Sequence, residues 1–357
     1  MRVRFITSTP WNVAQGSGTF VGISTLAESL CALGVSVETV TPKFSFPNYT
    51  LQRLVFNRLL PLHRLEDCDA TVGFDMDGYA LSGKGHGLQV AAIKGVIADE
   101  MRFESGLTRA TMRVQAARER LHVQRADLVI TTSQYSRQRI LDLYGGSKVP
   151  HVVPELIDLT AWSNLLASHP AAPPPNKFIV LCVCRFYPRK RLHVLLKAAA
   201  FLGDRVPELE VRIVGNGPQA GRLRVLCRAL RLKNLVVWMG DISLEQLARQ
   251  YNQAHIFCLP SVQEGFGLVF LEAMASGKPI VAARAAAVPE VVKCGLLVEP
   301  DNDEALAAAI EQLYRQPALR EKLAAEGREF VKTFDAPRVG RLYLDELTGR
   351  LGGPLRP

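Results

Sequence analysis

Two glutamates in the second half of the chain, Glu264 and Glu272, lie eight residues apart with Gly265 and Gly267 between them. They follow an apolar run, residues 255–260, which is typical of a buried parallel strand, and they lead into a helical pattern. A helix that begins after such a turn directs unpaired backbone N–H groups and the positive end of its dipole toward an anion. Carboxylates bind sugar hydroxyls through charge-assisted hydrogen bonds. The stretch therefore predicts a site for a phosphate-bearing ligand that contains a ribose or a sugar.

The surroundings of Glu272 leave two interpretations open. Most other residues of the predicted helix are apolar, and burying a carboxylate without hydrogen-bond donors is costly. The donors to Glu272 are therefore either protein groups or the hydroxyls of a bound ligand.

Two cations, Arg185 and Lys190, come directly after an apolar run at residues 178–184, which is predicted to be a buried strand. Other predicted strands of this half end at Gly215 and Gly240. Parallel strands place their carboxyl ends on one rim of a sheet, which is where open α/β sheets bind ligands. Such residues commonly form a solvated charge run, but this position favours a binding role.

Residues 264–279, EGFGLVFLEAMASGKP, closely resemble the donor-site signature of retaining glycosyltransferases of family 4, the glycosyl transferases group 1, which have the GT-B fold. The resemblance is strong over residues 178–300 and loose over 1–160. It implies that Arg185 and Lys190 correspond to the Arg-x4-Lys pair that binds the donor diphosphate, with Arg191 in place of the usual glycine. It also implies that Glu264 holds the donor sugar and Glu272 the ribose.

The resemblance implies a metal-independent transfer of a sugar, with retention at its anomeric carbon, from a nucleoside diphosphate to a hydroxyl acceptor. The donor phosphate takes the acceptor proton, and the nucleotide sugar is a co-substrate, so no cofactor or metal is expected. The reaction fits the synthesis of cell-surface glycans, glycolipids or other glycoconjugates. The expected catalytic residues are Arg185, Lys190 and Glu264. The expected donor-binding residues are Gly16, Ser17, Gly18, Gly215, Gly240, Gly265, Phe266, Gly267, Leu268 and Glu272.

The first half contributes the loop at residues 9–19, with Gly16, Ser17 and Gly18, before a predicted helix over 20–33. By resemblance this loop approaches the donor diphosphate and the acceptor, although a flexible turn remains the alternative. A dinucleotide fingerprint, with Glu38 as the acid that binds the ribose, is a weaker interpretation, because the glycines come some eight residues after the predicted strand.

The acceptor side is expected to include Lys94 and Asp99. Lys94 stands where many family members have a histidine, so the identity of the acceptor stays open among sugars, lipid-linked groups and small molecules. The pair Asp75 and Asp77 lies on the loop after a predicted strand at residues 69–74 and is interpreted as part of the loop structure.

The elements that position these residues alternate between strands and helices, which is typical of parallel sheets. We expect an α/β fold of two Rossmann-like, doubly wound domains that face each other across a cleft. The predicted acceptor-side domain covers residues 1–167 and is completed by a helix at 336–350. A proline-rich linker covers 168–176, and the donor domain covers 177–335.

The composition bounds the remaining possibilities. A chain of 357 residues with 48% hydrophobic content is globular, and no apolar run approaches the roughly 20 residues of a membrane helix. The net charge of +9 indicates anionic partners, but no basic run interleaved with aromatics suggests nucleic acid. Seven scattered cysteines favour a reducing cytoplasm. Residues 48–65 form a basic amphipathic segment that either contacts an anionic membrane at its inner face or packs on its own domain.

Two other functions remain as alternatives. The first is an NAD(P)-dependent oxidoreductase that uses the Gly16–Gly22 loop, which predicts tight binding of NAD(P) and none of a nucleoside diphosphate. The second is a non-catalytic protein that binds sugar nucleotides on the same fold.

Overall fold

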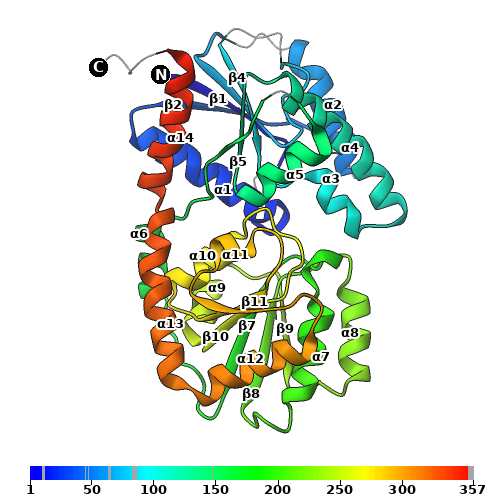
Figure 1. Cartoon of the computed structure of the whole chain (residues 1–357), viewed down its shortest axis with the longest axis vertical. Helices are drawn as coiled ribbons and strands as arrows, with labels where there is room; N and C mark the ends of the chain where they lie inside the picture. The colour runs from blue at the N-terminus through cyan, green and yellow to red at the C-terminus, as the bar shows by residue number, and fades with distance from the viewer. Residues whose placement is uncertain are drawn as a thin grey trace. The chain divides into compact units, whose positions relative to one another are not determined.

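The chain forms two compact units, each built around its own parallel sheet. The computed structural model describes residues 1–9, 13–44, 46, 48–62, 66–82, 87–146 and 148–352. The first unit comprises residues 1–156 together with the segment from Ala336 onward, and the second comprises Ile157–Asp335 (Figure 1). All seven cysteines are free thiols, and no helix of the described residues is long and apolar enough to cross a membrane.

The first unit has a six-stranded parallel sheet in the order β2-β1-β3-β4-β5-β6. Its strands are β1 (Arg2–Ile6), β2 (Ser36–Val40), β3 (Ala70–Phe74), β4 (Leu88–Ile93), β5 (Leu128–Thr131) and β6 (His151–Val152). Its helices are α1 (Val13–Ala32), α2 (Tyr49–Leu59), α3 (Ile97–Glu100), α4 (Gly106–Arg125), α5 (Gln134–Tyr144) and α14 (Ala336–Leu351), with 3-10 turns η1 (Leu60–Leu62) and η2 (Met101–Phe103). The strand order reverses between β1 and β3.

The second unit has a six-stranded parallel sheet in the order β12-β11-β10-β7-β8-β9. Its strands are β7 (Phe178–Val183), β8 (Leu209–Val214), β9 (Val236–Gly240), β10 (Ile256–Leu259), β11 (Ile280–Ala283) and β12 (Gly295–Val298). Its helices are α6 (Leu159–Ser168), α7 (Leu192–Leu202), α8 (Ala220–Ala229), α9 (Leu244–Gln253), α10 (Leu268–Ala275), α11 (Val288–Val291), α12 (Asp303–Arg315) and α13 (Pro317–Phe330), with 3-10 turns η3 (Pro188–Lys190) and η4 (Val331–Phe334). The strand order reverses between β7 and β10.

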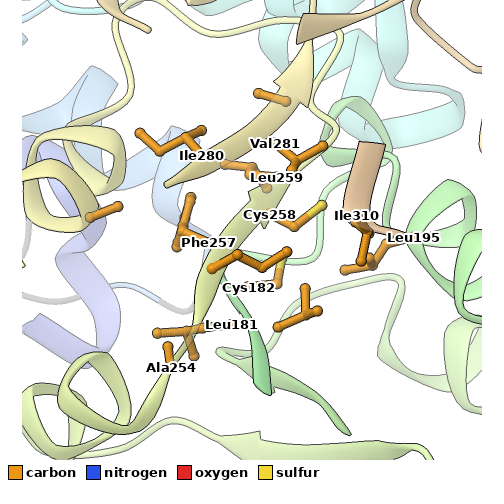
Figure 2. Packing of buried hydrophobic residues seen from close by; sticks show 14 of the residues in the cluster. Leu181, Cys182, Leu195, Ala254, Phe257, Cys258, Leu259, Ile280, Val281 and Ile310 are labelled. Atoms are coloured by element: carbon orange, nitrogen blue, oxygen red, sulfur yellow. The ribbon is translucent and has the colours of Figure 1, made fainter. Parts of the chain in front are cut away.

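The core of the second unit explains why its central strands are uniformly apolar. The strands β7 and β10 are covered on both faces, so Leu181 and Phe257 are as fully buried as Cys182 and Cys258. Figure 2 shows these side chains packed with residues of α7, α12 and β11. Ser243 and Gln246 form a capping box at the start of α9.

The boundary between the units differs from the one expected from the proline-rich stretch. It lies at Leu156 and Ile157, so α6 and residues 168–176 belong to the second unit. Trp162 Nε1 donates to Ser276 Oγ at 3.0 Å, and Asn252 Nδ2 donates to the Leu166 carbonyl at 2.9 Å. These contacts attach α6 to α10 and α9, which composition alone does not indicate.

The helix α14 belongs to the first unit and packs against α1 (Figure 1). Ser29 Oγ donates to the Ala336 carbonyl at 2.6 Å. A Cβ atom added at Gly340 would overlap Ser29 Oγ, so the missing side chain lets the two helices approach closely.

The start of α1 corrects the loop predicted at residues 9–19. The helix begins at Val13, so Gly16, Ser17 and Gly18 lie in its first turns; residues 10–12 are outside the described residues. Glycine disfavours a helix by only about 1 kcal/mol relative to alanine and does not remove a backbone hydrogen bond, so these glycines do not delay the helix.

Candidate active site

The rim of the second sheet brings together a cation and a carboxylate that are 74 residues apart in the sequence. Lys190 ends the turn after β7, Glu264 lies on the loop after β10, and Lys190 Nζ is 2.6 Å from Glu264 Oε1. Their side chains are 13% and 8% exposed. The Val262 N–H donates to the Arg189 carbonyl at 2.9 Å and joins the two loops directly. The pair lies at the reversal of strand order, the position at which open α/β sheets bind ligands.

The loops after β7, β8 and β9 meet on the same rim. The Gly215 N–H donates to the Gly240 carbonyl at 2.7 Å, and a Cβ atom at Gly215 (φ 113°) would overlap the Cys184 carbonyl. A Cβ atom added at Gly217 would likewise overlap the backbone of Phe186. The two expected donor-binding glycines, Gly215 and Gly240, are thus adjacent. Their lack of side chains keeps backbone groups close together at the rim.

Arg185 follows β7 at the same rim. Its guanidinium forms an ion pair with Asp241, at 3.4 Å, and both side chains are partly exposed. Arg191, which replaces the glycine usual in the family, takes a left-handed conformation (φ 51°) and pairs with Asp301 at 2.8 Å. The departure at residue 191 therefore adds an ion pair between the loops after β7 and β12.

The turn into α10 has the predicted form. Gly267 is the N-cap residue, with φ 95°, and Leu268 begins the helix. Phe266 is buried and stacks edge-on against Phe334 at 5.4 Å between ring centroids. Phe266 is therefore a packing residue of the second unit, and the neighbouring glycines supply the open backbone.

Glu272 has a protein partner that the sequence did not reveal. Tyr251 of α9 donates its hydroxyl to Glu272 Oε2 at 2.9 Å. Burial raises the pKa of Glu272 from its ordinary value near 4.5 to about 7, and the Tyr251 hydrogen bond partly opposes this shift. Tyr251 lies at an ordinary core position of α9, so no local pattern marks it as a functional residue.

The two residues expected on the acceptor side, Lys94 and Asp99, each have protein partners in the first unit. Lys94 follows β4, and its Nζ is 2.9 Å from Glu155 Oε2. Asp99 lies in α3, fully buried, and accepts from Arg102 at 2.8 Å and from the Tyr135 hydroxyl at 2.6 Å. Both oxygens of Asp99 are therefore occupied by protein donors.

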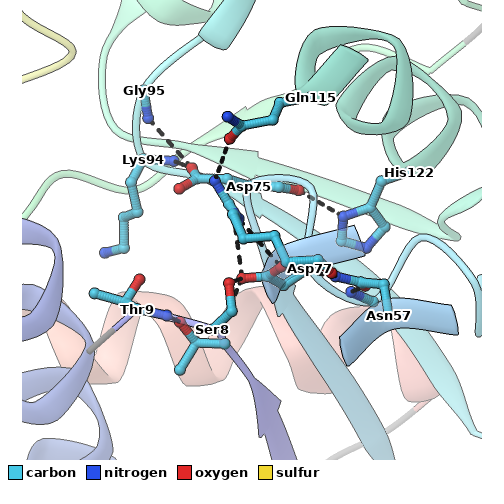
Figure 3. Close-up of polar contacts among 12 residues, drawn as sticks. Ser8, Thr9, Asn57, Asp75, Asp77, Lys94, Gly95, Gln115 and His122 are labelled. Atoms are coloured by element: carbon cyan, nitrogen blue, oxygen red, sulfur yellow. Dashed lines mark hydrogen bonds and ion pairs between the residues drawn. The ribbon is translucent and has the colours of Figure 1, made fainter. Parts of the chain in front are cut away.

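A polar network surrounds the carboxyl ends of β1 and β3 (Figure 3). Asp77 is fully buried and accepts from Ser8 N and Ser8 Oγ, each at 2.7 Å, and from Asn57 at 2.9 Å. Arg53 forms an ion pair with the same carboxylate at 3.2 Å. The interpretation of Asp77 as loop structure agrees with these contacts. Glu38, which a dinucleotide site would need, forms an ion pair with Arg4 at 3.1 Å.

A family model described as "Glycosyl transferases group 1" matches residues 167–330. The GDP-mannose-dependent alpha-(1-6)-phosphatidylinositol monomannoside mannosyltransferase of Mycolicibacterium smegmatis is 30% identical over 223 residues, which cover 57% of this chain and 57% of that protein. The chain thus spans just over half the length of this curated relative.

Solved structures match almost the whole chain. Sucrose-phosphate synthase from Thermosynechococcus elongatus has a TM-score of 0.81 at 23% identity and is covered to 98%, as is this chain. HepE of Anabaena, in complex with UDP and glucose, has a TM-score of 0.74 at 20% identity, over 98% of this chain and all of HepE. At these identities the likeness establishes the fold. Residues 167–330 thus match the glycosyl transferases group 1 model, and the chain has the GT-B fold.

Proposed function

We propose that the protein transfers a sugar from a nucleoside diphosphate to a hydroxyl acceptor, with retention at the anomeric carbon and without a metal ion. The ion pair between Lys190 and Glu264, at the reversal of strand order in the second sheet, carries this proposal. A cation and a carboxylate side by side suit a ligand with both a diphosphate and sugar hydroxyls. The comparison with glycosyl transferases group 1 over residues 167–330 supports the same reaction.

Each residue of the rim has a role in this reaction. As the bond from the sugar to the diphosphate breaks, negative charge grows on the leaving oxygen, and Lys190 and Arg185 stabilise it. Backbone N–H groups at the start of α10 further stabilise this negative charge. Glu264 holds hydroxyls of the donor sugar, and Glu272 holds the ribose. The acceptor oxygen bonds to the anomeric carbon on the leaving-group face, and its proton passes to the diphosphate.

The relatives suggest a class of substrate. One is named for GDP-mannose and a phosphatidylinositol mannoside, and HepE was solved with UDP and glucose. We therefore propose a hexose donor and a role in glycolipid or other glycoconjugate synthesis.

One assay tests the reaction. The full chain is incubated with UDP-, GDP- and ADP-linked hexoses and a panel of sugar and lipid-linked acceptors, with and without EDTA, and the released nucleoside diphosphate is measured. We expect one of the nucleotides to be released in an acceptor-dependent reaction that continues in EDTA. The anomeric configuration of the sugar in the product, measured by NMR, should match that in the donor. An inverted product, or loss of turnover in EDTA, contradicts the corresponding part of the proposal.

Peripheral contact with an anionic membrane is a separate part of the proposal. On α2 and η1, Leu51 and Leu62 are 48% and 78% exposed, and Arg58 is exposed between them. Arg53, part of the same predicted amphipathic face, instead points inward to Asp77, and residues 63–65 lie outside the described residues. Co-sedimentation with phosphatidylserine vesicles at low salt tests the contact. Binding that is equal with neutral phosphatidylcholine vesicles, or absent, contradicts it.

A further inference from the structure

Asp75, in the turn after β3, has a backbone conformation that is uncommon for a residue with a side chain. Its φ is 53°, in the left-handed region. The backbone is held on both sides, because the Asp75 N–H donates to the Ala92 carbonyl at 2.9 Å and His122 Nδ1 donates to the Asp75 carbonyl at 2.7 Å. Strained residues that their surroundings fix in this way concentrate at binding sites.

The neighbours of Asp75 make the turn rigid. Asp77 anchors it to Ser8 and thereby to the loop after β1 (Figure 3). The Gly78 N–H donates to Asn57 Oδ1 at 2.7 Å. This turn lies where the strand order of the first sheet reverses, which is the ligand position of an open α/β sheet. Asp75 is therefore held in one orientation at the rim of the first unit.

One oxygen of the Asp75 carboxylate has a structural role and the other does not. Oδ1 accepts from the Lys94 N–H at 2.9 Å and from the Gly95 N–H at 3.5 Å. Oδ2 has no hydrogen-bond partner in the part of the chain that the structure describes, and Asp75 is only partly buried. The nearby cation, Lys94, already pairs with Glu155. Among the described residues, the two cations nearest this carboxylate, Lys94 and Arg53, are thus already paired with Glu155 and Asp77.

We propose that Asp75 Oδ2 accepts a hydrogen bond from a hydroxyl group of the acceptor, and that the part of the acceptor at this rim is an uncharged sugar or polyol. This inference rests on the proposed glycosyl transfer. A carboxylate attracts hydroxyl donors and repels a phosphate, and Lys94 cannot compensate while Glu155 neutralises it. Asp75 orients the acceptor and takes no proton from it, because the proton lost on transfer passes to the diphosphate.

The electrostatic surroundings of Asp75 give a signature in solution. Burial raises the pKa of Asp75 from its ordinary value near 3.8 to about 6, and the charges of Asp77 and Glu100 add to this rise. Arg53 of α2 and the Lys94 N–H oppose it. On α4, Glu119 interacts electrostatically with this carboxylate, and His122 contacts the Asp75 carbonyl. Acceptor binding should therefore strengthen as the pH rises through about 6.

The test is equilibrium binding to the full chain saturated with its nucleoside diphosphate. The neutral probes are methyl α-D-mannoside and myo-inositol, and the charged probes are mannose 6-phosphate and inositol 3-phosphate. The variants are Asp75→Asn, which keeps an acceptor for the Lys94 N–H, and Asp127→Asn as control. Asp127 also accepts a hydrogen bond from a backbone N–H, that of Gln89, at 3.0 Å. It precedes β5, however, and so lies at the amino ends of the strands, whereas Asp75 lies at their carboxyl ends.

We expect a neutral probe to bind the unaltered chain more tightly than its phosphorylated form. Asp75→Asn should weaken that binding about tenfold or more, the effect of losing a hydrogen bond to a charged group, and should abolish the inflection near pH 6. Asp127→Asn should leave both unchanged. Any of three results overturns the proposal. The phosphorylated probes bind more tightly than the neutral ones, no neutral probe binds, or Asp75→Asn binds the neutral probes as tightly as the unaltered chain.

Two controls distinguish a failure of the inference about Asp75 from a folding defect of the variant and from a failure of the proposed glycosyl transfer. If Asp75→Asn does not fold, the pH dependence of neutral-probe binding to the unaltered chain is the test. Binding without an inflection near pH 6 then overturns the role of Asp75. Thermal-shift titration with nucleoside diphosphates is run on the same samples. Absence of nucleotide binding contradicts the proposed glycosyl transfer, whereas intact nucleotide binding without neutral-probe binding contradicts only the inference about Asp75.

Discussion

Lys190 Nζ and Glu264 Oε1 are 2.6 Å apart although the residues are 74 positions apart in the chain. The first follows the central strand β7 and the second follows its neighbour β10. Because neither side chain is more than 13% exposed, each depends on the other for charge compensation in the absence of ligand.

Replacing Lys190 with alanine should remove the cation that stabilises the leaving diphosphate. We expect kcat/KM for the nucleotide sugar to fall about 10²–10³-fold, or about 2.7–4 kcal/mol, as when an electrostatic donor is removed from comparable sites. Initial rates of nucleotide release measure this loss. Lys197→Ala, an exposed lysine on α7, is the matched control, and equal rates in the two variants would remove Lys190 from the mechanism.

The partly buried Glu272 should make nucleotide affinity depend on pH. Its pKa of about 7 means that it loses a proton in the range where the ribose requires a hydrogen-bond acceptor. We expect the Kd of the nucleoside diphosphate to decrease as pH rises through 7. Tyr251→Phe removes the hydrogen bond that lowers this pKa, so the midpoint should move to higher pH. Isothermal titration at several pH values measures both, and an identical midpoint in the two proteins would refute the assignment.

The same carboxyl should affect stability. Because its pKa is about 7 in the folded chain and near 4.5 in the unfolded chain, the unfolded state releases the proton first as pH rises. The contribution of Glu272 to the free energy of unfolding should therefore fall between about pH 4.5 and 7. In Glu272→Gln this part of the pH dependence should disappear, as measured by urea unfolding across that range.

Gly215→Ala should disrupt the donor rim. The new Cβ atom would overlap the Cys184 carbonyl at a φ of 113° that side chains rarely adopt. We expect a loss of about 1–3 kcal/mol or more in the free energy of unfolding, accompanied by weaker nucleotide binding. The control is Gly221→Ala on α8, where an added Cβ meets no atom within 4 Å. Chemical denaturation should show Gly221→Ala unchanged or up to about 1 kcal/mol more stable.

Gly340→Ala should separate α14 from α1. Its Cβ atom would overlap Ser29 Oγ, and overpacking of this kind costs about 1–3 kcal/mol. Gly349→Ala lies on the same helix with open space around it and should gain up to about 1 kcal/mol. Urea unfolding of both variants makes the comparison, and similar stabilities would mean that the contact between α1 and α14 contributes little.

The sequence determined the parallel α/β architecture, because alternating strands and helices leave few other arrangements. It also located the strand-turn-helix unit around Glu264 and Gly267, since glycine spacing and the change of periodicity are local features. The start of α1 at Val13 and the attachment of α6 to the second unit were not predictable in this way. A short glycine run does not fix where a helix begins, and a proline-rich segment need not be a domain boundary.

Tertiary structure alone decided which charges meet. The position of Lys190 beside Glu264 follows from the adjacency of β7 and β10, strands that are distant in sequence. The partner of Glu272 comes from Tyr251 on a different helix, and the left-handed Asp75 is held by β4 and α4. These relationships depend on strand order and helix packing, which are set by long-range burial of apolar surface and leave no mark in the spacing of neighbouring residues.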